Sequence, residues 1–266
     1  MTSTRPPCAR RATRLGRRSA LLGALAVAFA ASRRVWAFGE EGAFNPRLLV
    51  TGTAKLAGIR ARAPGRWSAE VVRRTSAPAR LTPTSVRADD AALLDEPFAI
   101  WAGSAAPEAL TRSELEGLRR FFALSGVLLC DELDPDKKLF LPAVKRELRR
   151  VLPDGSPISI GPEHVLFRSF YLLRRATGRV AASAKLEAIV RGGAAQVVFS
   201  PNDLLGALAR APGGVQPLEV VPGGEIQREQ AIRLAVNIAM YVLCSDYKDD
   251  QVHAPSLMRR RAMEQP

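Results

Sequence analysis

The chain has 266 residues, of which 47% are hydrophobic and 24% are charged, and its formal net charge is +13. This is the composition of a globular protein, and it excludes a disordered, a collagen-like and a multi-span membrane chain. Eight arginines and no acidic residue precede Phe38, and Arg259, Arg260 and Arg261 lie near the other end. Because the body between them is close to neutral, the net charge does not predict specific nucleic-acid binding.

The first 37 residues have the pattern of an export signal. Arg17 and Arg18 precede a short apolar run, and a small-residue end closes at Ala37. The arginine pair resembles the twin-arginine signal, which a receptor reads as an address. The apolar run is shorter than the roughly 20 residues of a membrane-spanning helix. We expect export to the periplasm or cell envelope, and two arginines after the run leave an uncleaved inner-membrane anchor as the alternative.

Beyond the signal, short apolar runs of strand length alternate with patterns of helical period. Strands are predicted over 47–53, 85–88, 95–102, 127–130, 185–190 and 196–199, and helices over 68–76, 111–124, 139–151, 201–208 and 225–244. Such alternation predicts a three-layer α/β domain with a mainly parallel, flavodoxin-like sheet and helices on both faces. The pair Gly192-Gly193 predicts one antiparallel hairpin in that sheet.

Two segments have the spacing of a helix-capping box. Thr111 is followed three residues later by Glu114, and Ser200 is followed by Asp203. In this motif a hydroxyl and a carboxylate each bind a backbone N–H that the helix itself leaves free. Each segment therefore predicts the start of a helix.

We divide the chain into the signal at 1–37, a linker at 38–46, the α/β domain at 47–245 and a basic tail at 246–266.

The cysteine and histidine content argues against a metal or disulfide scaffold. Cys8 lies in the signal, which leaves Cys130 and Cys244, both within apolar runs. They are either buried free thiols or the two ends of one bridge formed in an oxidising compartment. Two histidines cannot supply a histidine-rich zinc site.

Five segments occur in the order typical of a bacterial family: FAIWAGS, TRSELEGLRRFFALSGVLLCDE, GPEHVLFRSFYLL, VVFSPND and AIRLAVNIAMYVLCSDYKDDQVHAPSLMRRR. The chain resembles the domain-of-unknown-function family 4159 from Arg47 to the C-terminus. That family is similar in fold to class I glutamine amidotransferases. The resemblance implies an envelope-associated bacterial protein of undetermined biochemical role.

The resemblance does not bring the amidotransferase mechanism with it. Those enzymes need a cysteine on a sharp strand-to-helix turn, with a histidine partner. The corresponding segment, Trp101 to Ala106, has no cysteine, and it carries Gly103-Ser104 where relatives have Gly-His. Ser104 is therefore either a candidate nucleophile or a simple turn residue.

Acidic residues gather after the strand predicted at 127–130, where α/β sheets place their ligands. Asp131, Asp134 and Asp136 are candidate ligands for a divalent metal, and Asp131 is also a candidate acid–base group. Their spacing matches no standard metal loop, so solvated turn residues are the alternative. His164 is a third catalytic candidate, with a structural histidine as its alternative. No organic cofactor is predicted.

The segment after the last predicted helix mixes charges with tyrosine and histidine. It is a candidate docking strip for an envelope protein partner, or a solvated tail. The candidate partner-binding residues are Tyr247, Lys248, Asp249, Asp250, His253, Arg259, Arg260 and Arg261. Contact with the membrane is expected only through the signal or an uncleaved anchor. We expect a non-catalytic binding or assembly module, with a metal-assisted hydrolase using Asp131, His164 and Ser104 as the alternative.

Overall fold

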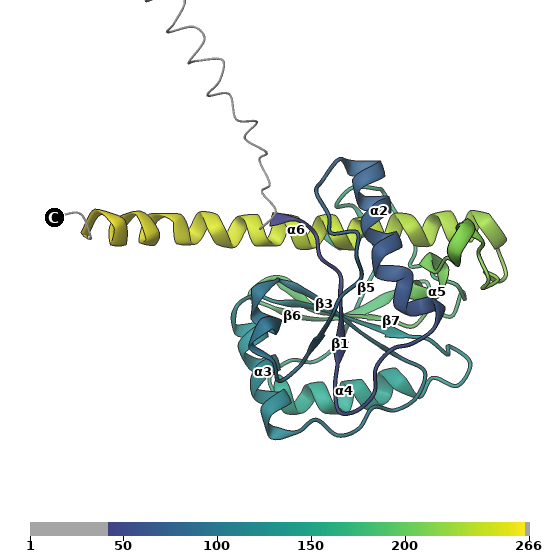
Figure 1. Ribbon diagram of the computed structural model, residues 1–266, viewed down its shortest axis with the longest axis horizontal. Coiled ribbons are helices and arrows are strands. Elements are labelled where there is room, and N and C mark those ends of the chain that lie inside the picture. The colour runs from purple at the N-terminus through teal and green to yellow at the C-terminus, as the bar shows by residue number, and fades with distance from the viewer. Residues whose placement is uncertain (1–41, 264–266) are drawn as a thin grey trace, which may run out of the picture. The chain divides into compact units, whose positions relative to one another are not determined.

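The computed structural model describes residues 42–263, with side chains to residue 245. Its centre is one seven-stranded sheet in the order β2-β1-β3-β4-β7-β6-β5 (Figure 1). The strands are β1 (Arg47–Val50), β2 (Ser85–Arg87), β3 (Phe98–Gly103), β4 (Val127–Glu132), β5 (Ile158–Ile160), β6 (Leu186–Arg191) and β7 (Ala194–Ser200).

The five strands from β2 to β7 are parallel, and β6 runs antiparallel between β7 and β5. This confirms the α/β class, the mainly parallel sheet and the hairpin at Gly192-Gly193. The order 2-1-3-4-7 of the parallel strands is the flavodoxin-like order, because the chain first adds a strand on one side of β1 and then on the other.

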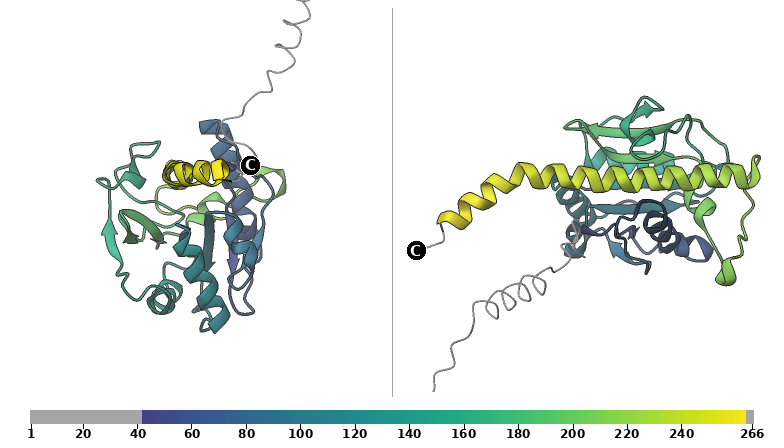
Figure 2. Two further views of the ribbon diagram at one scale, coloured as in Figure 1. Left: turned by 90° about the vertical axis from the view of Figure 1, so that its left-hand side faces the viewer. Right: turned by 90° about the horizontal axis from the view of Figure 1, so that it is seen from above.

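Helices cover both faces of the sheet. They are α2 (Ala63–Thr75), α3 (Arg112–Ala123), α4 (Phe140–Val151), α5 (Leu204–Leu208) and α6 (Gly224–Met263), with short 3-10 turns η2 (Ile59–Arg62), η3 (Ala91–Asp95), η4 (Val165–Phe167) and η5 (Pro212–Gly214). The helices α3 and α4 lie on one face, and α2, α5 and α6 lie on the other. Seen from above, α6 lies over the sheet (Figure 2, right).

The continuous apolar runs explain why both faces are covered. In β3, Ile100 packs into the core under α2 and α6, whereas Ala99 and Trp101 pack into the core under α3 and α4. Successive side chains of a strand point to opposite faces, so a strand that is apolar at every position needs a partner layer on each side. β4 follows the same rule, and all six of its residues are buried.

Two contacts join α2 to α6 on their common face. The buried indole Nε1 of Trp67 donates to the carbonyl oxygen of Ala235 at 2.8 Å. Arg74 forms a bidentate pair with Glu229, at 2.8 and 2.7 Å. Since α2 and α6 are far apart in sequence, these contacts tie the two ends of the domain together.

The capping box at Thr111 is confirmed, and the one at Ser200 is wrong. Thr111 and Glu114 make both reciprocal bonds at the start of α3. Ser200, in contrast, is the last residue of β7, and α5 begins only after Asp203. The side chain of Asp203 accepts the N–H of Gly206 at 2.9 Å, so Asp203 is the cap rather than the third residue of the box.

Three further differences concern the extent of elements. α2 begins at Ala63 rather than at Ser68, with Pro64 in its first turn, where a missing N–H costs nothing. α6 continues past Cys244 to Met263. β5 was not predicted, since three residues are too few for a periodic pattern. Within residues 42–263, no helix combines the length and the apolar character needed to cross a bilayer.

Candidate functional site

The carboxyl ends of β1, β3, β4 and β7 meet at one edge of the sheet, which we call the C-terminal edge. In open α/β sheets, ligands bind at this edge where the strand order reverses, here between β1 and β3. Glu114 occupies this crevice: it accepts the N–H of Gly52 at 2.6 Å and the N–H of Thr111 at 2.8 Å. The buried carboxylate therefore joins the end of β1 to the start of α3.

Asp131 lies at the end of β4 and is fully buried. Its two carboxylate oxygens accept the N–H groups of Leu204 and Leu205, at 3.0 and 2.8 Å. Burial, together with the nearby carboxylate of Asp203, raises the pKa of Asp131 to about 7, although the two N–H donors act in the opposite direction. The side chain thus caps the start of α5 from a neighbouring strand.

Asp203 forms a second buried centre beside Asp131. Its carboxylate accepts two bonds from Arg60, at 3.0 and 2.6 Å, and a further bond from Arg179. Asp203 has no exposed surface, while each arginine side chain retains nearly a quarter. Sequence analysis did not find this cluster, because Arg60 lies 143 residues from Asp203 and no local pattern links them.

The acidic residues after β4 have separate tasks. Glu132 is buried and accepts the N–H groups of Phe140 and Leu141 at 3.0 and 3.1 Å, which caps the start of α4. Asp134 pairs with Lys137 at 3.1 Å, and this contact lowers the pKa of Asp134. Asp136 is exposed on the same turn. Within residues 42–245, no three His, Cys, Asp or Glu side chains form a group that could hold a metal ion.

His164 lies at the start of η4 and has a local structural contact. Its Nδ1 accepts the N–H of Leu166 at 3.2 Å, and its ring centroid lies 6.3 Å from that of Tyr241 on α6. Burial lowers the pKa of His164, and the neighbouring Glu163 acts in the opposite direction. The histidine therefore serves as a cap beside α6.

The structure does not bring His164 and Asp131 together. Tyr241, the neighbour of His164, accepts the N–H of Ala195 at the beginning of β7. Asp131 is instead in register with Ser200 at the end of β7. The two candidate catalytic groups thus lie at opposite ends of one strand.

Ser104 is exposed in the loop after β3 and lies at the same edge as Asp131. The preceding Gly103 packs against the ring of Phe140, where an added Cβ would lie 2.6 Å from a ring carbon. The turn therefore depends on glycine at 103. No triad-like group forms around this serine within the described side chains.

Both cysteines of the domain are free thiols, so the bridge is not formed. Cys130 is fully buried, and burial raises the pKa of its thiol well above the ordinary value. Cys244 is exposed on α6, contrary to the expectation that both thiols are buried. The two belong to different layers, since Cys130 faces the core under α3 and α4.

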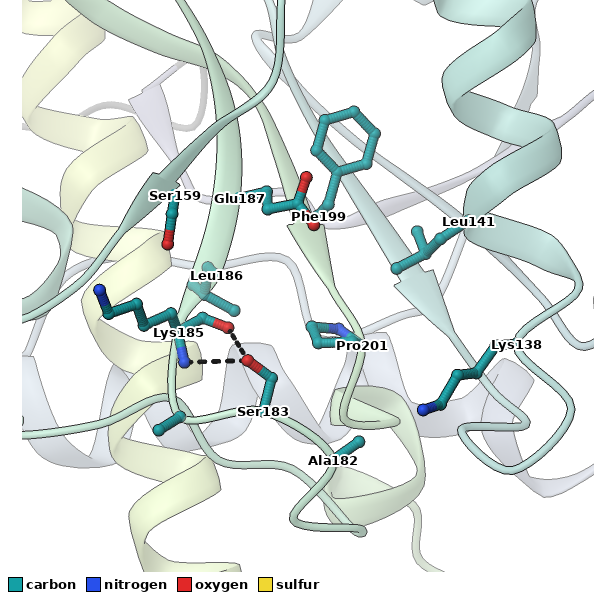
Figure 3. Close-up of a pocket in the computed structure, with 11 residues that line it drawn as sticks. Lys138, Leu141, Ser159, Ala182, Ser183, Lys185, Leu186, Glu187, Phe199 and Pro201 are labelled. Carbon is teal, nitrogen blue, oxygen red and sulfur yellow. Dashed lines mark hydrogen bonds between the residues drawn. The ribbon is translucent and has the colours of Figure 1, made fainter.

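An open pocket of about 550 Å³ lies at the C-terminal edge and was missed from the sequence. It is bounded by the start of α4, the loop before β6, the start of β6 and the end of β7 (Figure 3). The pocket combines apolar, basic and acidic groups, the last from Glu187, and they come from segments that are distant in the chain. A second open pocket, of about 790 Å³, lies near Tyr241 and the hairpin at Gly192-Gly193.

Two sets of predicted residues lie outside the described side chains. Arg17, Arg18 and Ala37 precede the described part of the chain. The candidate partner-binding residues from Tyr247 to Arg261 belong to the part of α6 whose side chains are not described. Both interpretations stay predictions.

The domain is therefore an α/β protein with a mainly parallel sheet, a reversal of strand order and capped helices at its C-terminal edge. A scan against family models matches residues 48–243 to the domain of unknown function DUF4159, and the chain belongs to this family. The match ends at residue 243, so it does not extend to the C-terminus as we expected. No curated protein matches the chain significantly.

Proposed function

We propose that the chain is exported to the cell envelope and acts there as a binding or assembly module on an amidotransferase-like fold. The observation that carries this proposal is the use of the buried carboxylates at the C-terminal edge. Asp131 caps α5 and Glu132 caps α4, each through two backbone N–H groups. If either carboxylate moved away to take part in a reaction, its N–H donors would stay buried without a partner. Each unpaired donor costs about 1–3 kcal/mol of stability.

The same edge offers surface for a partner. The loop of Ser104, Ala105 and Ala106 is exposed, as is the turn from Asp136 to Leu139. Small side chains on a fixed loop can approach another backbone closely, and loops at this edge commonly carry binding functions. We propose that an envelope protein contacts this surface, with the segment from Tyr247 to Arg261 as a second contact.

A photo-reactive residue placed at Ser104 tests the binding role in intact cells. Leu124 is the matched control, because it is also exposed but follows α3 at the opposite edge of the sheet. We expect a discrete cross-linked product from position 104 and none from position 124. Equal labelling at both positions, or none at either, would contradict a specific partner at the C-terminal edge.

Export is tested separately by replacing Arg17 and Arg18 with lysine. The twin-arginine receptor recognises the arginine pair itself, so lysine keeps the charge but is not recognised as an export signal. We expect unprocessed chain to accumulate in the cytoplasm. Unchanged export would mean that another signal directs the protein.

A metal-assisted hydrolase is the second candidate, favoured by the pKa of about 7 for Asp131. Perturbed carboxyl groups at strand ends occur in active sites, where they act as acids or bases. This function requires Asp131 to release the start of α5 and to bind a metal ion. Thermal unfolding with and without Mg²⁺ or Ca²⁺ separates the two functions. A rise in the unfolding midpoint that is lost in Asp131→Asn supports the hydrolase, and no rise supports the binding module.

A further inference from the structure

The outer surface of α3 and α4 carries a group of exposed arginines. The two helices are neighbours on the side of the sheet opposite α6 (Figure 1). The guanidinium group of Arg119 on α3 donates to the carbonyl oxygen of Arg150 on α4 at 2.7 Å, which joins the two helices. We call the surface formed by these exposed arginines the arginine face, and its members are Arg119, Arg120, Arg146, Arg149 and Arg150.

Acidic groups neutralise little of this charge. Glu147 of α4 pairs with Arg150, and Glu116 of α3 pairs with Arg112 at 3.1 Å. The next acidic residue along the chain, Asp154, lies in the exposed turn after α4. Within residues 42–245, no acidic side chain forms an ion pair with the other four members of the face, which are Arg119, Arg120, Arg146 and Arg149.

The helix dipole explains only part of this arrangement. A cation in the last turn of a helix is attracted by the free carbonyl groups there, and Arg120, Arg149 and Arg150 hold such positions. Arg119 and Arg146 lie before the last turn, where this attraction has faded. Like charges at neighbouring helix positions repel one another, so an anionic partner would stabilise the arginine face.

An exposed apolar side chain borders the face and indicates the kind of partner. Leu124 follows α3, keeps 64% of its surface exposed and donates its N–H to the carbonyl oxygen of Arg120. The aromatic side chains of the two helices, Phe121, Phe122 and Phe140, are buried, so they cannot stack on nucleic-acid bases. Arginines beside an exposed leucine match an anionic bilayer, which has charged headgroups above hydrocarbon.

We propose that the arginine face docks the domain on an anionic phospholipid bilayer, with the arginines at the headgroup phosphates and Leu124 in the interface. This inference rests on the proposed function, because export places the chain beside phospholipid membranes. We expected membrane contact only through the signal or an uncleaved anchor, so this surface is a further one. Since α3 and α4 end at the edge of the sheet opposite the C-terminal edge, the C-terminal edge stays accessible to a protein partner.

The test is co-sedimentation of the full chain with lipid vesicles. One set of vesicles contains phosphatidylcholine alone, and the other contains an equal part of the anionic lipid phosphatidylglycerol. Residues 1–41 are the same in every variant, so binding through them cancels when the variants are compared. We expect the wild type to partition more strongly into the anionic vesicles, and this preference to fall as salt is added, because the arginines are exposed.

The face variant combines Arg146→Gln with Arg149→Gln, and the matched control combines Arg174→Gln with Arg175→Gln. All four side chains are exposed, and within residues 42–245 none of them forms an ion pair or a side-chain hydrogen bond. The control arginines lie in the loop before β6, on the side of the sheet covered by α6. We expect the face variant to bind anionic vesicles about fivefold more weakly per arginine, or roughly 25-fold for the pair, and the control to stay within about twofold.

A third variant, Leu124→Ser, tests the apolar contact. It should weaken binding to the anionic vesicles without changing how that binding depends on salt, because it removes an apolar contact and no charge. A photo-reactive residue at position 124 would label lipid under this proposal, so it still gives no cross-linked protein.

Three results overturn the inference. The first is equal partition of the wild type into both kinds of vesicle, and the second is an equal loss in the control, which would indicate attraction by total charge. The third is release of the chain from anionic vesicles by a DNA duplex at the same phosphate concentration, which would indicate a nucleic-acid surface. The vesicle measurement depends neither on export nor on cross-linking at Ser104, so its failure and a failure of the proposed function are distinguishable.

Discussion

Replacement of Asp131 by asparagine should change how the stability of the protein depends on pH. Asparagine has nearly the same shape but is neutral at every pH. Its one carbonyl oxygen accepts either the Leu204 or the Leu205 N–H, and its amide group faces the other. That unpaired donor is expected to cost about 1–3 kcal/mol at any pH.

The ionisation of Asp131 makes a second, pH-dependent contribution to stability, and this one favours the asparagine variant. In the folded protein the pKa of Asp131 is raised from 3.8 to about 7, mainly by burial. The folded state therefore holds a proton that the unfolded chain has released, and this contribution to stability is lost as the pH rises from about 4 to 7. Each pH unit in that window is worth up to about 1.4 kcal/mol, so the whole loss is on the order of 4 kcal/mol.

The two effects predict a crossing of the stability curves. Below about pH 5 the asparagine variant should be less stable than the wild type, and by pH 8 the difference should vanish or reverse. Urea unfolding of both chains from pH 4.5 to 8.5 measures this, and the difference between them cancels the titration of other groups. Asp136→Asn is the control, since Asp136 is exposed and its curve should run parallel to that of the wild type. Parallel curves for Asp131→Asn would refute the assignment of a raised pKa to this side chain.

Two further predictions concern the packing and the ion pairs of the same domain. Gly178→Ala places a Cβ against the carbonyl oxygen of Asn202 and should lower the free energy of unfolding by about 1–3 kcal/mol. Gly161→Ala is the control, because its Cβ meets only the end of a flexible side chain. Equal losses of stability for the two variants in urea titrations would contradict this prediction. Glu229 has its pKa lowered to about 2, first by its bonds to Arg74, so its contribution is present above pH 4.5 and lost as the pH falls towards 2. Because this carboxylate is about a third exposed, Glu229→Gln should lower the free energy of unfolding by only about 1 kcal/mol at pH 7 and leave it unchanged near pH 2. An equal loss of stability at both pH values would show that the charge of Glu229 is not the cause.

The sequence was sufficient wherever the determining contact is local. The apolar runs Phe98 to Trp101 and Val127 to Cys130 predicted strands buried on both faces, and both lie in the centre of the sheet. Thr111 and Glu114 predicted the start of α3, since a capping box needs only residues three positions apart. The second box failed because pairing with β4 keeps Ser200 in the strand, in register with Asp131, and α5 begins only after Asp203.

Only the tertiary structure decided what the polar residues do. Asp131 was a catalytic candidate in the sequence, yet the N–H groups that it binds belong to residues 73 and 74 positions away. Periodicity records the environment of a residue relative to its own helix or strand, so it predicts which face is buried and where a helix begins. It does not record which distant segment supplies a hydrogen-bond partner, and that partner determines whether a carboxylate caps a helix.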